Sequence, residues 1–411
     1  TSLEERAQSD LQNPNRSVLE DKPYKYNFRL YANSAKAFAQ MNFDYDRLDF
    51  YVGVTASQTA YQREGLFQNG NFPNNSLGKS EQLNFTDFGG KLGANYKLTA
   101  KHLFGFNAAW YTKPPNLRNS FSNSRQNNDV VVGLASEQIQ NIDISYRYRS
   151  STIKARLSAY YTQIKDATEI SFYYADGLSG LGRNSTTAFV QEVLSGIDKQ
   201  HLGLEMGVEA QLTSAIKLKA AAALGQFVYS NSPELYLTSD DFNEIVDYGT
   251  SCLKNYRIAG GPQRAAQIGF EYRDPDYWWF GTTINFFSQA FLDVSPLTRT
   301  SNFLNDTDGL PILNYDANVA EKLLKQEQFK DYMLVNAIGG KSWLVKGKFI
   351  GFFVSLNNIF DKLYKTGGFE QSRNANYRTL KQDRERENPI FGPKYWYGTG
   401  ASYFAMIYVR F

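Results

Sequence analysis

The chain has 411 residues, of which 42% are hydrophobic, 15% aromatic and 21% charged, and its formal net charge is +3. No stretch approaches the roughly 18 apolar residues that a transmembrane helix needs, the aromatic content is too high for a disordered chain, and the small net charge does not indicate a nucleic-acid-binding protein. The single cysteine, Cys252, excludes a disulfide framework. A soluble globular protein remains, or a membrane β-barrel, whose alternating strands are compatible with the mean hydropathy of −0.47.

Hydrophobic residues recur mainly with period 2, which is the spacing of an extended strand. Between Leu202 and Leu212 every second residue is apolar, whereas Glu205 and Glu209 belong to the opposite face. Each such strand has one apolar and one polar face, because successive side chains point to opposite sides. Helical spacing is rare, and the best candidate is the short segment 317–329.

The predicted strands form hairpins with short turns, and one strand stands alone at the end of the chain. In chain order they are residues 38–46 with 48–62, 88–98 with 102–112, 138–149 with 152–164, 201–212 with 216–229, 265–273 with 277–288, 332–343 with 347–357, and finally 397–411. The connections between hairpins are much longer and are rich in Asn, Gly, Ser, Asp and Pro: residues 63–86, 113–137, 165–200, 230–264, 289–331 and 358–396.

This strict alternation of short and long connections distinguishes two kinds of all-β protein. In a soluble sandwich or propeller, connections above about 15 residues are uncommon. A membrane barrel has short periplasmic turns and long extracellular loops. The sequence therefore predicts an all-β fold, an antiparallel transmembrane β-barrel, with a soluble all-β protein carrying long loops as the alternative.

The number of predicted strands, thirteen, raises a problem of closure. Bacterial single-chain barrels usually have an even number of strands, and an open edge in lipid leaves unpaired backbone groups that each cost several kcal/mol. Either the count is wrong or strands are missing before Thr1. On the second reading, residues 1–37 are an extracellular loop or a partial strand that continues from the missing part, and residues 38–411 are the C-terminal part of the barrel.

Several motifs resemble those of TonB-dependent outer-membrane receptors. SLNNIFDKLY at 355–364 is similar to a motif of their penultimate strand, and ASEQIQNIDISYRYRSS at 135–151 resembles a recurring hairpin. KPPNLRNSFSNSRQNN at 113–128 resembles a mid-barrel extracellular loop. GGFEQSRNANYR at 367–378 and the terminal GTGASYFAMIYVRF resemble receptors of the Bacteroidota type, the SusC/RagA-like relatives. The resemblance spans most of residues 38–411.

The resemblance implies a fold and a function for the complete protein. The family fold is a 22-stranded barrel with an N-terminal plug, so about 13 of 22 strands are expected here and the plug domain is absent from this sequence. The implied function is import of a scarce solute, such as a glycan, a peptide or a metal chelate, across the outer membrane of a Gram-negative bacterium of the Bacteroidota. The implied partners are outer-membrane lipid, TonB through the missing plug, a SusD-like surface lipoprotein and the outer-membrane assembly machinery.

A second function belongs to another class. The barrel is then a structural or docking subunit of a multi-protein outer-membrane complex and carries no solute. An enzyme is not expected, because His102 and His201 begin two strands without an accompanying Ser or Cys nucleophile pattern. No cofactor and no metal are predicted. Residues 305–309 (NDTDG) hint at a calcium loop, but the spaced final acid is missing.

The long loops are the predicted place of ligand or partner contact. Residues 230–264, 289–331 and 358–396 are the first choice, and 113–128 is the second. The individual candidates combine positive charge, amide groups and aromatic rings, and they are Arg118, Asn119, Arg125, Tyr236, Phe291 and Arg373.

The last strand carries a separate signal. Tyr403, Ile407, Val409 and Phe411 share one face of an alternating segment that ends in an aromatic residue. Such an ending resembles the signal that the outer-membrane assembly machinery reads, so these residues are predicted to face lipid and to direct barrel assembly.

Overall fold

The computed structural model describes residues 2–181, 187–240, 242 and 244–411. Most of its strands belong to one sheet, in which neighbours along the main path are antiparallel. The path runs, in order, through β1 (Phe28–Asp44), β2 (Leu48–Gly65), β4 (Leu83–Lys97), β5 (His102–Lys113), β6 (Glu137–Arg149), β7 (Ile153–Asp176), β8 (Thr187–Gln211), β9 (Ile216–Tyr229), β12 (Arg264–Arg273), β13 (Trp278–Ser288), β14 (Tyr332–Val345), β15 (Lys348–Asn357) and β18 (Ser402–Arg410).

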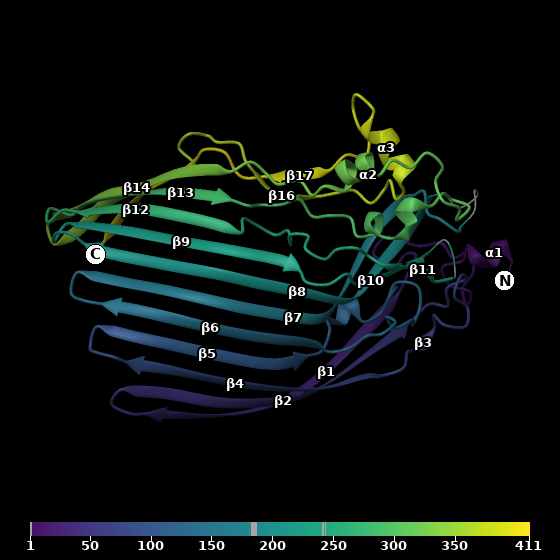
Figure 1. The fold of residues 1–411 in the computed structure, drawn as a ribbon, viewed down its shortest axis with the longest axis horizontal. Coiled ribbons are helices and arrows are strands. Elements are labelled where there is room, and N and C mark those ends of the chain that lie inside the picture. The colour runs from purple at the N-terminus through teal and green to yellow at the C-terminus, as the bar shows by residue number, and fades with distance from the viewer. Residues whose placement is uncertain (1, 182–186, 241, 243) are drawn as a thin grey trace.

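The two ends of the sheet differ, as Figure 1 shows. At the turn end, short connections join the strands of each hairpin; at the loop end, the long connections gather and carry their own small elements. These elements are α1 (Leu3–Arg6), β3 (Gly78–Lys79), η1 (Leu117–Asn119), β10 (Glu234–Ser239), β11 (Val246–Thr250), η3 (Leu297–Arg299), η4 (Ser301–Leu304), α2 (Ala317–Leu324), β16 (Lys365–Phe369), α3 (Tyr377–Arg384) and β17 (Lys394–Tyr397). The predicted asymmetry of short turns and long loops is confirmed.

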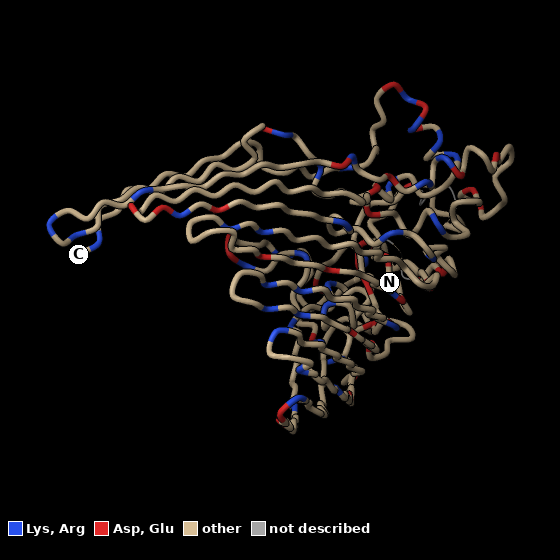
Figure 2. Tube along the Cα trace, turned by 60° about the vertical axis from the view of Figure 1, so that its left-hand side comes forward, with Lys and Arg blue, Asp and Glu red and all other residues tan. Residues whose placement is uncertain are grey.

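The sheet is curved, and its two outermost strands are edges (Figures 1 and 2). Within the described residues, β1 pairs along the path only with β2, and β18 pairs only with β15. None of the helices in this part of the chain has the length and hydrophobicity of a membrane span. The share of a 22-stranded barrel that this sheet represents stays a prediction.

The two faces of the sheet reverse the usual distribution of polarity. Ile144 on the convex face is 57% exposed, whereas the next residue, Ser145, is 2% exposed on the concave face. Soluble proteins bury their large apolar residues, but here such residues are exposed along many strands, among them Leu157, Leu202, Leu204, Met206, Val208, Ile268 and Ile284. A sheet whose outer face lies in lipid has this pattern, because its apolar residues contact hydrocarbon chains.

Most predicted strands are confirmed, with shifts at their ends. Each predicted strand falls on a strand of the main path, and α2 begins at the first residue of the predicted helical segment. β1 begins at Phe28, earlier than expected, and β18 begins at Ser402, later than expected. Tyr403, Ile407 and Val409 lie in β18, Phe411 follows it, and all four are exposed, whereas their role in barrel assembly stays a prediction.

The prediction of a long loop at 165–200 is wrong, because β7 and β8 continue through most of it. A β-bulge interrupts their pairing between Ile164 and Glu169, where Asp166 adopts a φ of 59°. On the facing strand, Gly196 has a φ of 69°, and the Asp198 carboxylate accepts a hydrogen bond from the Asp166 amide at 3.1 Å. A bulge shifts which face each residue takes, so the period-2 pattern breaks although the strands continue.

The extended part of β8 is anchored by the largest hydrophobic cluster, which lies at the loop end. Val190 of β8 is fully buried in this cluster together with Leu235 and Leu237 of β10 and with Leu297 of η3. Burial of several aliphatic side chains, at about 1.5–3 kcal/mol each, fixes the loops against the strands. The candidate site lies beside this cluster.

Candidate ligand-binding site

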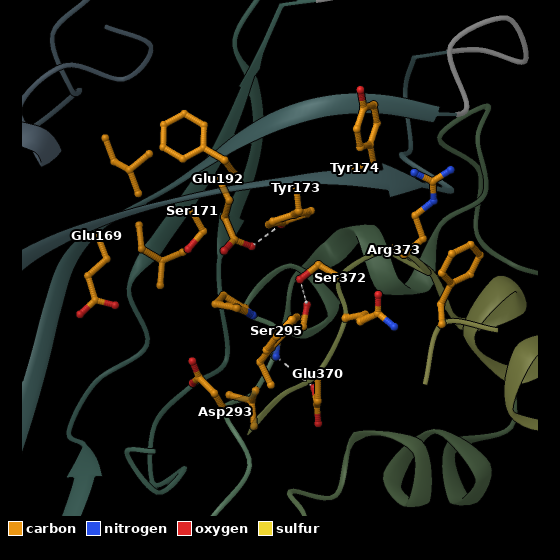
Figure 3. Close-up of a pocket in the computed structure, with 18 of the residues that line it drawn as sticks. Glu169, Ser171, Tyr173, Tyr174, Glu192, Asp293, Ser295, Glu370, Ser372 and Arg373 are labelled. Atoms are coloured by element: carbon orange, nitrogen blue, oxygen red, sulfur yellow. Dashed lines mark hydrogen bonds between the residues drawn. The ribbon is translucent and has the colours of Figure 1, made fainter. Parts of the chain in front are cut away.

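A pocket of about 780 Å³ lies at the loop end, against the extended parts of β7 and β8 (Figure 3). Its walls come from residues 169–174 of β7, the segment 293–296 after β13, and the segment 369–373 that follows β16. The pocket lies beyond the β-bulge, where β7 and β8 continue past the apolar part of the sheet. The volume is within the range of about 300–1,000 Å³ that small-molecule sites occupy.

Glu192 of β8 is a buried acid in the pocket wall. Its side chain is nearly inaccessible, with the residue 3% exposed, and Oε2 accepts hydrogen bonds from the Tyr173 hydroxyl at 2.6 Å and from the Leu297 amide at 3.1 Å. Burial raises the pKa of Glu192 to about 7, because the protein interior disfavours the charged form. Near neutral pH this carboxyl group is therefore only partly ionised.

Asp293 is a second acid with an altered pKa, and its side chain faces the open pocket. The pKa of Asp293 is raised to about 6. The main cause is that the pocket walls reduce the hydration of its carboxylate, and repulsion from Glu169 and Glu370 adds to this effect. Figure 3 shows these acids on the same side of the pocket. Glu169 is paired with Lys199, whose ammonium group balances its charge.

A buried ion pair ties two walls of the pocket together. The Arg299 guanidinium holds Glu370 through both carboxylate oxygens, with Nη2 to Oε1 at 3.1 Å, and Glu370 Oε2 also accepts a hydrogen bond from the Ser295 amide at 3.0 Å. The hydroxyl groups of Ser295 and Ser372 are 2.7 Å apart (Figure 3). Segments 293–296 and 369–373 are therefore held side by side.

Three of the six predicted contact residues line this pocket: Arg118, Arg125 and Arg373. Arg118 is exposed, and within the described residues its guanidinium has no hydrogen bond or ion pair. Arg125 is half-buried, with its guanidinium 4.9 Å from the ring centre of Phe172 and no carboxylate partner in the described part of the chain. The loop 113–128 thus contributes to the pocket wall, and its contact with a ligand stays a prediction.

Arg373 is more tightly held than the other two arginines. Its Nε donates to the Asp176 carboxylate at 2.5 Å, and its guanidinium lies 5.6 Å from the ring centre of Tyr174 and 5.3 Å from that of Phe391. Figure 3 shows Arg373 beside Tyr174, away from Asp293. Arg373 and Asp293 therefore lie on different sides of the pocket.

The other three candidates do not line the pocket. Asn119 donates from Nδ2 to the Thr168 carbonyl at 2.8 Å, which attaches its loop to β7. Tyr236 is buried, and its hydroxyl accepts a hydrogen bond from the Val132 amide at 3.1 Å. Phe291 lies just before the segment that forms the wall. The contact roles of these three residues stay predictions, and the geometry gives the first two structural tasks.

The acids of the pocket could not be identified from the sequence. Glu192 lies within residues 165–200, for which the sequence predicts a loop, and Asp293 follows a strand without any local motif. Two of the three loops predicted to bear the ligand, 289–331 and 358–396, do contribute walls, whereas 230–264 contributes none. Loop position was informative, but burial of an individual acid depends on contacts between distant segments.

No group of three or more His, Cys, Asp or Glu side chains that could hold a metal ion occurs among the described residues. At the suggested calcium loop, Asp306 Oδ1 accepts hydrogen bonds from the amides of Asp308 and Leu310, each at 3.0 Å. This arrangement is that of an ordinary Asp-containing turn.

A curved antiparallel sheet with an apolar outer face and a ligand-sized pocket among long loops defines the wall of a transmembrane β-barrel. The family model "TonB dependent receptor-like, beta-barrel" matches residues 4–359. The chain therefore belongs to the family of TonB-dependent receptor β-barrels, which places it in the outer membrane of a Gram-negative bacterium.

Solved structures share this fold at low sequence identity. The unliganded ferric citrate transporter FecA is 12% identical with a TM-score of 0.58, over 95% of this chain and 47% of that chain. The siderophore receptor PiuA from Acinetobacter baumannii is 11% identical with a TM-score of 0.58, over 93% and 44%. The copper transporter OprC is 14% identical with a TM-score of 0.56, over 93% and 48%. The chain thus spans less than half the length of these structures, and no curated protein sequence matches it.

Proposed function

We propose that this chain is part of an outer-membrane receptor and transporter that binds a scarce solute in the pocket beside β7 and β8. The observation that carries this proposal is the position of the pocket. It lies at the loop end, beyond the apolar part of the sheet, where a solute from outside meets the protein first. Passage of the solute would follow when TonB acts on a plug inside the complete barrel. The chain itself has a binding role and no catalytic one.

The proposed solute is a metal chelate, a glycan or a peptide. The similar solved structures are those of a copper transporter, a ferric citrate transporter and a siderophore receptor. The motifs at 367–378 and at the C-terminus support a receptor of the Bacteroidota type, with a SusD-like lipoprotein over the loop end. The exposed face of Tyr403, Ile407, Val409 and Phe411 supports recognition by the outer-membrane assembly machinery.

A docking role without transport has one observation in its favour. Leu310 and Leu313, in the connection before α2, are exposed apolar residues at the loop end. Exposed apolar surface of this kind often marks a protein contact. A SusD-like lid would also use such a surface, so this surface does not distinguish the docking role from the receptor role. The two roles differ in whether the pocket retains a solute.

The retention of solutes tests the proposal. The protein, extracted from its outer membrane in detergent, is incubated with ferric citrate, with a mixture of malto-oligosaccharides or with a tryptic peptide pool, and retained molecules are identified by mass spectrometry. A Ser171→Trp variant, which places a large ring in the pocket, is the comparison. We expect retention from at least one mixture and its loss in the variant. Equal or absent retention in both proteins contradicts the receptor role and favours docking.

A further inference from the structure

We propose that the pocket recognises an organic anion that carries a flat ring, and that Arg118 and Arg125 bind its acidic group. This inference rests on the proposed function, because it names the chemical class of the solute for the same pocket. It is carried by the balance of charges in the pocket, by the aromatic rings that line it, and by a second pair of arginines, Arg147 and Arg156, that have no ion pair within the described residues.

The acidic side chains of the pocket are largely neutralised from within the protein. Glu370 is held by the buried Arg299, and Glu169 is paired with Lys199. Glu192 is buried and hydrogen-bonded, and its raised pKa makes it partly neutral near pH 7. Asp293 alone among these acids faces the open pocket without an ion pair in the described residues. These acids therefore do not indicate a strongly cationic ligand.

The arginines of the pocket, unlike its acids, are mostly not neutralised by other groups among the described residues. Arg118 and Arg125 have no carboxylate partner within the described residues, and the Arg125 guanidinium lies near the rings of Phe172 and Tyr26. Arg373 uses Nε for Asp176, and its terminal nitrogens have no hydrogen bond to any of the described residues. A guanidinium binds a carboxylate or phosphate through two parallel hydrogen bonds. An anionic group is therefore the missing partner.

Aromatic side chains supply the second recognition element. Tyr174, Phe369 and Trp396 line the pocket and are exposed, and Phe391 also lines it. The rings of Phe369 and Trp396 are packed together with centres 5.8 Å apart. Exposed aromatic faces stack on flat rings of a ligand and on sugar rings. A ring that bears a carboxylate or phosphate would contact both the aromatic and the arginine residues.

An independent observation comes from the concave face near the turn end. In the register of β6 and β7, Arg147 lies directly opposite Arg156, and Arg149 lies directly opposite Lys154. Like charges in directly opposed positions destabilise a sheet. Within the described residues, Arg147 and Arg156 have no ion pair, and these two side chains are exposed. Lys154 is paired with Glu209, whereas Arg147 and Arg156 remain as two opposed guanidinium groups at an end of the sheet where basic residues recur (Figure 2).

Two fluorescent probes that share one ring system test the charge preference. Dansyl-glutamate carries two carboxylates, and dansylcadaverine carries an ammonium group. Their affinities are measured by fluorescence anisotropy with the protein extracted from its outer membrane in detergent. We expect dansyl-glutamate to bind at least tenfold more tightly. Arg118→Gln and Arg125→Gln should each weaken its binding roughly tenfold, as expected for a charge-assisted hydrogen bond.

The controls separate charge recognition from damage to the fold. Arg378 on α3 is exposed and lies outside the pocket, so Arg378→Gln should leave the affinity unchanged. Heat-induced shifts in gel mobility should match among all variants. Tighter binding of dansylcadaverine, or no effect of the two pocket arginines, overturns the anion inference. Loss of dansylcadaverine binding in Ser171→Trp would then show that the pocket still binds solutes.

Absence of binding by either probe also overturns the anion inference for a ring-bearing ligand. The receptor role is judged separately by the retention of ferric citrate, oligosaccharides or peptides described above. If that retention also fails, the proposed function fails with the inference. If it succeeds, only the chemical class of the solute is wrong.

Discussion

Arg299 and Glu370 form an ion pair that is almost sealed from solvent, with side chains 2% and 12% exposed. The two residues come from segments that are far apart in the chain, and their contact holds the wall at 293–296 against the wall at 369–373. Arg299 also donates from Nη2 to the Leu324 carbonyl at 2.8 Å, which attaches the end of α2 to the same point. The pocket therefore depends on a pair that is not part of the sheet.

We expect Arg299→Met to destabilise the protein by about 3–5 kcal/mol, because removal of one partner leaves the Glu370 carboxylate buried and uncompensated. Glu370→Gln should cost less, and the double variant should cost less than the sum of the single variants. Guanidinium unfolding in detergent, followed by tryptophan fluorescence, gives the double-mutant cycle. Additive single effects would show that the pair is not coupled.

Glu192 predicts a pH dependence of stability. Its folded-state pKa of about 7 lies above the ordinary value of 4.5, so protonation favours the folded state. This contribution is fully present below pH 4.5 and is lost as the pH rises through about 7. Relative to Glu192→Gln, the wild type should lose on the order of 2–3 kcal/mol between pH 4.5 and pH 8. Unfolding at several pH values checks this, and parallel pH profiles of the two proteins would contradict it.

Met206 and Gly207 are neighbours on opposite faces of β8, in the middle of its apolar run. Met206→Arg should destabilise the protein by about 2–4 kcal/mol, the cost of an arginine facing the middle of the membrane. Gly207→Arg should be much milder, because an added Cβ at Gly207 meets no atom within 4 Å. The yield of heat-modifiable protein in outer membranes reports both effects. Similar yields would mean that the two faces are assigned wrongly.

The opposed Arg147 and Arg156 predict a stabilising substitution. Arg147→Glu replaces repulsion across the two strands with an ion pair and should stabilise the protein by about 0.5 kcal/mol. Arg147→Gln serves as the matched neutral control and should gain less. The measurement is the unfolding midpoint of each variant at low and at high salt. A destabilising effect of Arg147→Glu would contradict repulsion between Arg147 and Arg156, and would mean that an anionic group already balances their charges.

The sheet could be predicted from the sequence because its physics is local. Each hairpin strand carries its own apolar face, as residues 202–212 show, and lipid rather than another layer covers that face. The extension of β7 and β8 was missed because Asp166 and Gly196 form a bulge region that shifts the pattern. When a bulge shifts the alternation of apolar and polar residues within a strand, the sequence pattern looks locally like the end of the strand and the start of a loop.

The site was predictable only in part, for a related reason. The loop that carries Arg118 and Arg125 was chosen for its composition, and both residues line the pocket. Glu192 acquires its altered pKa from burial, and Asp293 acquires its altered pKa from the pocket walls and from repulsion by Glu169 and Glu370, all of which belong to segments that are distant in the chain. Asn119 has the same polar character as a ligand contact, but its amide is used to hold a loop. Composition locates polar loops, and tertiary contacts decide which side chains stay free.

The central claim is that the sheet crosses a membrane with its convex face in lipid, and site-directed spin labelling tests it most directly. In a Cys252→Ser background, single labels are placed at Leu204, Glu205, Met206 and Gly207 in outer-membrane vesicles. Collisions with oxygen, which concentrates in lipid, should be frequent at 204 and 206, and collisions with a water-soluble nickel complex should be frequent at 205 and 207. Equal accessibility of all four sites to the nickel complex would contradict the account.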